Sequence, residues 1–292
     1  MDDRLLTWNP HPRMPALALP ALACDAHVHV FGPLARFPFD AASAIRPADA
    51  PKEALYALHR HLGIGRCVIV QSLVHGFDNR VVEDAIAAGN GRYLGVALVP
   101  VDVADAELAR LAAAGFRGVR FNFMSAHSVA AQADGVLALS HRLAPLQMHL
   151  QLQIDGPLIH SLAGVIEGSA VPVVIDHIGR VDASLGPSGT DFSVLRTHLR
   201  RSGPGRAMVK LSGIDRVSNP PDYADGIALA AILADEFPEQ CLWGTDWPHP
   251  NHDYVPDDAT LVDALAQIAP SAPLREQILV RNPGAFYRFQ PG

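Results

Sequence analysis

Cysteine is scarce in this chain of 292 residues. The three cysteines are Cys24, Cys67 and Cys241, and they lie far apart in the sequence. A disulfide-stapled domain uses an even set of cysteines, and many zinc sites use CxxC pairs. This odd, scattered set excludes both kinds of framework.

Long apolar runs are also missing. Charges or glycines interrupt each apolar stretch before it reaches the length of a membrane span. The N-terminus begins with Met1-Asp2-Asp3-Arg4 and continues through several prolines, without the basic start and apolar segment of a signal peptide. We therefore expect a soluble, cytoplasmic protein with no membrane partner and an extended N-terminal arm at residues 1–22.

The charge balance argues against nucleic acid as a partner. The chain has 30 acidic against 23 basic residues, so its formal net charge is −7, whereas a nucleic-acid-binding surface is basic. A local basic pocket for a small anion remains compatible with this balance. Hydrophobic residues make up 49% and charged residues 18% of the chain, which is enough to bury a large core.

What the chain does contain is a regular alternation of β-branched runs with Ala- and Leu-rich segments. The predicted strands are Ala23–Val30, Arg66–Ser72, Tyr93–Pro100, Gly118–Phe123, Met148–Ile154, Val171–His177, Ala207–Ser212 and Cys241–Trp247. The predicted helices include Lys52–Leu62, Val81–Ala88, Asp105–Ala114, Gly135–Leu143, Tyr223–Phe237 and Leu261–Ile268. This order predicts an α/β fold, a (β/α)8 TIM barrel over residues 23–292. A doubly wound sheet is the alternative, but the first strand lacks its GxGxxG turn.

Two long loops, Phe31–Pro51 and Gly179–Thr190, follow predicted strand ends. The active sites of TIM barrels are built from the loops at these ends of the strands. We therefore place both loops beside the site and leave open whether they close over a substrate. The histidines of the predicted helices, among them His59 and His198, are expected to face solvent.

The pair His27-Val28-His29 ends the first predicted strand. Residues two apart on a strand face the same side, so both imidazoles are predicted to face one site. So short a pair could also be two histidines buried under a loop. Other strand ends carry matching polar residues, which favours a site: Arg120, Asp176, His177, Arg216, Asp246 and Asn251. His75 follows the second strand and is expected to reach the same pocket.

These residue types point to hydrolysis. Asp246 beside three histidines can activate a water, either directly or through a metal-bound hydroxide. Nearby imidazoles can polarise a carbonyl and stabilise an oxyanion. Arg120 and Arg216 can clamp a carboxylate with paired hydrogen bonds. The expected substrate is therefore a small, anionic carbonyl compound.

The motifs resemble the amidohydrolase superfamily, in its 2-pyrone-4,6-dicarboxylate lactonase-like branch. The similarity runs from about Cys24 to Tyr287. Its motifs are His27-Val28-His29-Val30-Phe31-Gly32-Pro33, Phe37-Pro38-Phe39, Val70-Gln71, His75-Gly76, Asp78-Asn79, Arg120-Phe121-Asn122-Phe123, Ile175-Asp176-His177, Gly179-Arg180 and Trp243–Asn251. The resemblance implies a lactonase that opens an intramolecular ester to an acid. It makes Asp246 the general base and places His27, His29 and His177 around the scissile carbonyl. It also implies that Arg120 and Arg216 bind a substrate carboxylate and that Asn251 lies at the substrate.

The sequence departs from the pattern of this branch at positions that are expected to determine substrate specificity. Ile45 and Gln153 stand where tyrosines are expected, and Leu73 stands where a serine is expected. An arginine expected shortly after Phe123 has no counterpart in residues 124–128. The substrate is therefore a pyrone dicarboxylate or a related lactone with fewer or different anionic groups, such as a muconolactone, its sulfonated analogue or a sugar-acid lactone.

The cofactor is left open between none and one divalent metal, zinc or manganese. The ligands would be His27, His29, His177 and Asp246. The fifth strand carries Gln151 and Gln153 where many members of the superfamily place a histidine or a modified lysine. The alternatives for function are a decarboxylase, a lactone isomerase and a barrel that only binds ligand. A monomer and a homodimer are both compatible with the sequence.

Overall fold

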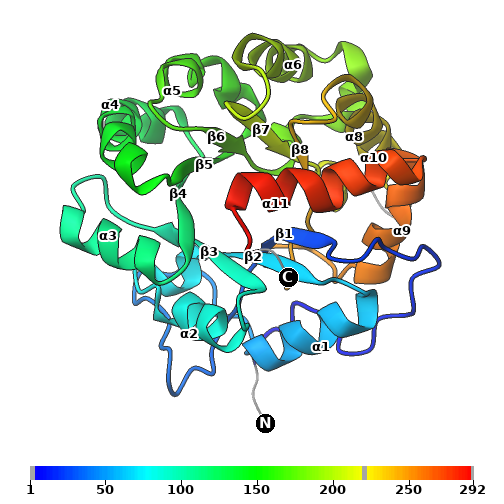
Figure 1. The fold of residues 1–292 in the computed structure, drawn as a ribbon, viewed down its shortest axis with the longest axis horizontal. Coiled ribbons are helices and arrows are strands. Elements are labelled where there is room, and N and C mark those ends of the chain that lie inside the picture. Colours follow the sequence, from blue (N-terminus) through cyan, green and yellow to red (C-terminus); the bar gives the residue numbers. More distant parts are fainter. Residues whose placement is uncertain (1–3, 219–221, 291–292) are drawn as a thin grey trace.

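The computed structural model describes residues 4–218 and 222–290 and contains one sheet of eight parallel strands in the order β1 to β8. The strands are β1 (Cys24–Val28), β2 (Arg66–Val70), β3 (Tyr93–Leu98), β4 (Phe116–Phe123), β5 (His149–Ile154), β6 (Val173–Ile175), β7 (Ala207–Lys210) and β8 (Cys241–Leu242). Helices surround this sheet, and the view in Figure 1 looks along the barrel. The predicted (β/α)8 TIM barrel is confirmed, and every predicted strand region contains a strand.

Backbone hydrogen bonds close the barrel between β1 and the chain that continues from β8. The Ala26 amide donates to the Trp243 carbonyl at 2.8 Å, and the His29 amide donates to the Trp247 carbonyl at 2.7 Å. Between them, the Asp246 amide donates to the His27 carbonyl at 2.8 Å. These bonds hold the end of β8 against the two histidines of β1.

The helices of the described chain follow the strands in turn. They are α1 (Lys52–Leu62), α2 (Arg80–Ala88), α3 (Asp105–Ala113), α4 (Ala126–Leu143), α5 (Ala163–Gly168), α6 (Thr190–Ser202), α7 (Ile214–Val217), α8 (Ala224–Glu236), α9 (Asp258–Ile268), α10 (Ala272–Glu276) and α11 (Asn282–Tyr287). Helix α4 begins nine residues earlier than the predicted Gly135 because Ser125 and Ser128 form a capping box at its start. Short 3-10 segments fill several of the turns.

Two layers of side chains fill the inside of the barrel. The lower layer is apolar and includes Val68, Val96, Val174 and Met208, with Tyr287 packed against it. Helix α11 crosses this end of the barrel in Figure 1, so the C-terminal segment covers the starts of the strands. The polar residues of the site therefore lie at the opposite end, where the strands finish.

Strand β1 departs from simple alternation. Its pairing with β2 shifts register between Asp25 and Val28, which marks a bulge. As a result Ala26 belongs to the apolar layer inside the barrel, and yet the next side chain, His27, also reaches Asp176 and Asp246 inside the barrel. The bulge thus aims His27 and His29 at the same space.

The N-terminal segment lies along the barrel. Trp8 packs against Trp247 with ring centroids 5.5 Å apart, and Arg13 pairs with Asp263 of α9 at 2.5 Å. The boundary between arm and barrel at residue 22 stays a prediction. In the described residues no helix is long and apolar enough to cross a membrane.

The solvent exposure expected for two helical histidines was wrong. His59 is buried, and its Nδ1 lies 3.0 Å from the Tyr93 hydroxyl. His198 is also buried and lies 3.0 Å from the Glu167 carboxylate. Both rings find polar partners inside the helix layer, which makes their burial tolerable.

Gly244 provides a test of the contact between β8 and β1. A Cβ there would lie 2.6 Å from the His27 amide nitrogen and 2.9 Å from Asp25 Oδ1. We expect Gly244→Ala to lower the free energy of unfolding by about 1–3 kcal/mol, as overpacking does. Urea unfolding followed by circular dichroism measures this, with Gly164→Ala as the control because its Cβ would meet nothing within 4 Å. Equal stability of the two variants would contradict the proposed close contact.

Candidate active site

A pocket of about 520 Å³ opens where the strands end. Its wall includes six of the residues predicted for the site: His29, Arg120, His177, Arg216, Asp246 and Asn251. Ile45, Leu73 and Gln153, the three departures from the pattern of the branch, also line it. The structure therefore brings these predicted catalytic and specificity positions into one cavity, whereas His27 is wholly buried behind its wall.

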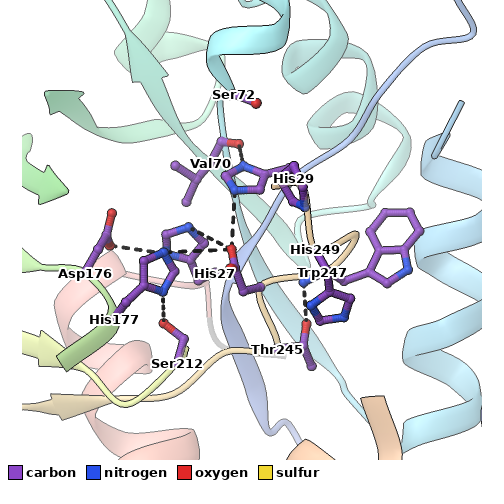
Figure 2. A network of polar contacts seen from close by, with 12 residues as sticks. His27, His29, Val70, Ser72, Asp176, His177, Ser212, Thr245, Trp247 and His249 are labelled. Carbon is purple, nitrogen blue, oxygen red and sulfur yellow. Dashed lines mark hydrogen bonds and ion pairs between the residues drawn. The ribbon is translucent and has the colours of Figure 1, made fainter. Parts of the chain in front are cut away.

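Three imidazoles converge on a single oxygen of Asp246. Oδ1 lies 3.6 Å from Nε2 of His27, 3.4 Å from Nε2 of His29 and 3.9 Å from Nε2 of His177. Figure 2 shows these rings from β1 and from the end of β6 around one point. All four side chains are buried. The predicted four-residue centre is thus assembled.

The Nδ1 nitrogen of each ring points away from Asp246 and contacts a group that fixes the orientation of the ring. The His29 Nδ1 donates to the Val70 carbonyl at 2.7 Å, since a carbonyl can only accept. The His177 Nδ1 lies 3.0 Å from the Ser212 hydroxyl. The His27 Nδ1 lies 3.2 Å from the ammonium nitrogen of Lys210. Two of the rings are therefore held by neutral groups and the third by a cation.

The backbone of the site adopts an unusual conformation. Asp246 has φ +66°, and His177, Ile178 and Arg180 have φ +51°, +55° and +48°. Left-handed backbone is unfavourable for residues with a Cβ, most of all for a branched one such as isoleucine. Such strain collects at functional sites, where the surrounding structure holds it.

A second buried carboxylate, Asp176, lies below the histidines. Its Oδ2 accepts hydrogen bonds from Arg120 Nε at 3.0 Å and from Gln151 Nε2 at 3.1 Å. Its Oδ1 lies 3.5 Å from the Lys210 ammonium. Together these residues form a polar layer above the apolar one, with a carboxylate held between two cations.

Electrostatics keep the two carboxyls ionised, and burial keeps the imidazoles of His27 and His177 neutral. Burial opposes ionisation of Asp246, but Arg216 and the histidines outweigh it and hold the pKa of that carboxyl well below its usual range. Burial, aided by Lys210, lowers the pKa of His27 to about 3, and burial also lowers that of His177. Burial lowers the pKa of Lys210 to about 8. Asp246 is therefore available as a base at neutral pH.

Three arginines surround the pocket, one more than predicted. Arg216 pairs with Asp246 through Nε and donates from Nη2 to the Pro250 carbonyl at 3.0 Å. Arg180 lines the same pocket, and its guanidinium pairs with no carboxylate of residues 4–218 or 222–290. Burial and the neighbouring Arg216 lower the pKa of Arg180. A guanidinium in this situation is suited to bind an anion from outside the chain.

Two positions differ from the expectation based on the sequence. His75 does not line the pocket: its Nδ1 lies 3.0 Å from the Pro38 carbonyl, and its Nε2 accepts from the Gly32 amide at 3.4 Å. Sequence reasoning missed Lys210, which is wholly buried at the end of β7. A lysine at a strand end resembles a solvated residue, and only the barrel places it opposite Asp176.

The donor spacing alone would allow a metal ion. Ligand atoms of His27, His29 and Asp246 lie within 4.8 Å of one another, as do those of His27, Asp176 and His177. A metal-bound histidine normally donates its other ring N–H to an acceptor, as His29 does toward Val70. His27 Nδ1 lies 3.2 Å from both the Lys210 ammonium and Asp176 Oδ1, but only the contact with Lys210 is a hydrogen bond. His27 therefore does not suit a metal, and we derive no chemical step through zinc or manganese.

Comparisons with known proteins show what this chain is similar to. A model of the amidohydrolase family matches residues 24–289. A 2-pyrone-4,6-dicarboxylate hydrolase from Comamonas testosteroni is 39% identical, over 97% of this chain and 95% of that protein. A 4-sulfomuconolactone hydrolase from Rhizobium radiobacter is 35% identical, over 93% of this chain and 92% of its own.

Solved structures share the fold. One from Agrobacterium tumefaciens has a TM-score of 0.81 at 25% identity and covers 95% of this chain and 100% of that one. An amidohydrolase from Burkholderia multivorans, solved with zinc bound, has a TM-score of 0.69 at 19% identity and covers 92% of this chain and 100% of its own. A likeness at 19% identity shows the shared fold alone.

The polar layer predicts a pH-dependent stability effect for Asp176. Removing its charge leaves Arg120 and Lys210 buried without a carboxylate, so Asp176→Asn should lower the free energy of unfolding by about 3–5 kcal/mol at neutral pH. Burial opposes ionisation, but His27, Lys210 and Arg120 hold the pKa of Asp176 below its ordinary 3.8. Its contribution is therefore full above pH 3.8 and is lost as the pH falls through the lower, native-state pKa.

Urea unfolding across this pH range measures the difference between Asp176→Asn and the wild type. The control is Asp105→Asn, because Asp105 forms an exposed pair with Arg142 and its side chain is 81% exposed. That variant should change stability by less than about 1 kcal/mol. A loss at Asp176 as small as the control's would show that this carboxylate does not hold the polar layer together.

Proposed function

The chain belongs to the amidohydrolase family, and we propose that it hydrolyses a small lactone carrying two anionic groups, with Asp246 as the general base. The observation that carries the proposal is the ionised Asp246 carboxylate, surrounded by three imidazoles at the mouth of an arginine-lined pocket. The lactone hydrolases among its relatives, at 39% and 35% identity, support the same chemistry.

The reaction follows from the position of Asp246. Its carboxylate accepts a proton from water while the water oxygen forms a bond to the lactone carbonyl carbon. The carbonyl oxygen becomes an oxyanion beside the imidazoles of His27, His29 and His177, where an N–H donor stabilises it. The bond from that carbon to the ring oxygen then breaks, and the leaving oxygen takes the proton from Asp246. Water and lactone give one ring-opened acid.

The arginines support an anionic substrate. Arg120, Arg180 and Arg216 come from different strands and loops, so they reach the pocket from different sides. A guanidinium binds a carboxylate or a sulfonate through two parallel hydrogen bonds. Arg180 lines the pocket and pairs with no carboxylate of the described residues, which favours two anionic groups on the substrate rather than one. Asn251 in the pocket wall would contact the same ligand.

The substrates to test first are 2-pyrone-4,6-dicarboxylate and 4-sulfomuconolactone. Both are lactones with two anionic groups, and they are the compounds after which the two relatives are named. Ile45 and Leu73 make part of the pocket wall apolar. On that side the pocket selects lactones by their shape and not by hydrogen bonds. A cytoplasmic location and a monomeric or homodimeric state belong to the same proposal.

Product mass separates hydrolysis from the two other reactions considered. A hydrolysed lactone gains the mass of one water, an isomerised lactone keeps its mass, and a decarboxylated acid loses carbon dioxide. Acid release measured with a pH indicator at mildly alkaline pH identifies the substrate among the two compounds and simple sugar-acid lactones.

Asp246→Asn tests the general base. The amide cannot accept the proton of water, so turnover of the identified lactone should fall at least about a hundredfold. Steady-state hydrolysis and circular dichroism are measured on the variant, because a folded but inactive protein is required. If the folded variant keeps turnover within about tenfold of the wild type, a base role for Asp246 is wrong.

Arg180→Met tests the second anionic group. Losing a charged hydrogen bond costs about 1.5–3 kcal/mol, so kcat/KM for a dianionic lactone should fall about tenfold to a hundredfold. The same variant should handle a lactone with a single anionic group almost as the wild type does. Arg201→Met is the control, because Arg201 pairs with Glu167 and its side chain is 65% exposed. Equal losses on both kinds of lactone would refute the assignment of Arg180 to the second group.

A further inference from the structure

Lys210 is buried beside the catalytic centre. It is one of only two lysines in the chain, and its side chain has no exposed surface. Its Nζ lies 2.8 Å from Gln151 Oε1, 3.2 Å from His27 Nδ1 and 3.5 Å from Asp176 Oδ1. An ammonium group has three N–H donors and no acceptor, so Gln151 Oε1 and His27 Nδ1 accept hydrogen bonds from it, and Asp176 Oδ1 is its ion-pair partner.

This contact determines where His27 carries its proton. The nitrogen that faces a donor must present its lone pair, so His27 Nδ1 is the unprotonated nitrogen and the proton is on Nε2. Asp176 Oδ1 also lies 3.2 Å from His27 Nδ1, yet this oxygen has no hydrogen-bond partner in the described structure. The ring is therefore not oriented to donate to Asp176, and Lys210 is its partner.

The proton on His27 Nε2 has no partner within the described chain. This atom is buried and forms no hydrogen bond, and the nearest carboxylate oxygen, Asp246 Oδ1, is 3.6 Å away. An unused buried donor costs free energy, which a ligand oxygen placed there would recover. The lactone carbonyl of the proposed reaction has such an oxygen.

We propose that Lys210 is a positioning residue that holds His27 in the Nε2–H form, as a hydrogen-bond donor to the substrate carbonyl, and so keeps His27 from ligating a metal. The proposal rests on the proposed function for the identity of the acceptor. A protonated Nε2 has no lone pair for zinc. A divalent ion bound there would also place a second cation across the same ring from the Lys210 ammonium.

Removing Lys210 should move the proton of the neutral His27 ring from Nε2 to Nδ1. Without the ammonium, Asp176 Oδ1 is the remaining charged partner of His27 Nδ1, and it can only accept. The proton would then move to Nδ1 and leave a lone pair on Nε2, directed toward Asp246. His27 would lose its donor for the carbonyl and become a histidine of the metal-binding form.

The direct test is the tautomer of His27 in the full-length protein. Two-bond proton–nitrogen correlation spectra of protein labelled with 15N-histidine distinguish the two neutral forms, and the missing signal in His27→Gln assigns the residue. We expect Nε2–H in the wild type and Nδ1–H in Lys210→Met, whereas Lys52→Met, which changes the chain's other lysine at a pair with Asp84, should match the wild type. Nδ1–H in the wild type, or an unchanged tautomer in Lys210→Met, would overturn the proposal.

Zinc binding and turnover give independent readouts. Equilibrium dialysis should show zinc binding to Lys210→Met at least about tenfold tighter than to the wild type, and adding His27→Gln should abolish the gain. Hydrolysis by Lys210→Met should fall about a hundredfold, as for loss of one oxyanion donor. An equal zinc affinity in both proteins counts against the proposal.

One further variant and the absence of substrate from the spectra keep the test decisive. If Lys210→Met does not fold, Lys210→Arg retains a donor, so Nε2–H in that variant and in the wild type supports the proposal and Nδ1–H in either overturns it. The spectra need no substrate. Nε2–H together with no hydrolysis of any lactone would therefore reject the proposed function while leaving the assignment of Lys210 in place.

Discussion

The ion pair between Arg216 and Asp246 links the charge of the site to its fold. Asp246 is buried on a left-handed backbone after β8, where an isolated carboxylate would take up a proton. Arg216 comes from α7, after β7, and compensates that charge. The Asp246 amide, bonded to the His27 carbonyl, fixes the same residue to β1. The base can thus stay ionised because neighbouring strands meet at this point.

In the polar layer below, neighbouring cations likewise compensate the charge of a second buried carboxylate. Asp176 is held between Arg120 and Lys210, and all three residues are buried, although Arg120 also lines the pocket. Lys210 also contacts His27, so the polar layer and the histidines above it form one hydrogen-bonded network. In the proposed reaction, a change in the charge of the polar layer would therefore be felt at the substrate carbonyl, which a purely apolar barrel interior would not transmit.

Periodicity predicted the barrel and most of the centre. The alternation of the strands correctly placed His27 and His29 on one face, although a bulge after Asp25, invisible in the pattern, aims them inward. Lys210 and Arg180 were beyond such reasoning. Lys210 has a role only once β5, β6 and β7 lie side by side, and the direction of Arg180 depends on consecutive left-handed residues that no local propensity favours. Long-range pairing and strained backbone decide both positions.

The proposed reaction gives Arg216 two uses that compete. Without ligand its guanidinium is paired with Asp246, which weakens that carboxylate as a base because the pair favours the ionised form. An anionic group of the substrate would compete for the same guanidinium, and each hydrogen bond that it takes from Asp246 leaves the carboxylate more basic. A lactone without an anion at this position would leave the pair intact. Substrate charge would then govern the strength of the base as well as binding, since part of the binding energy goes into the chemical step.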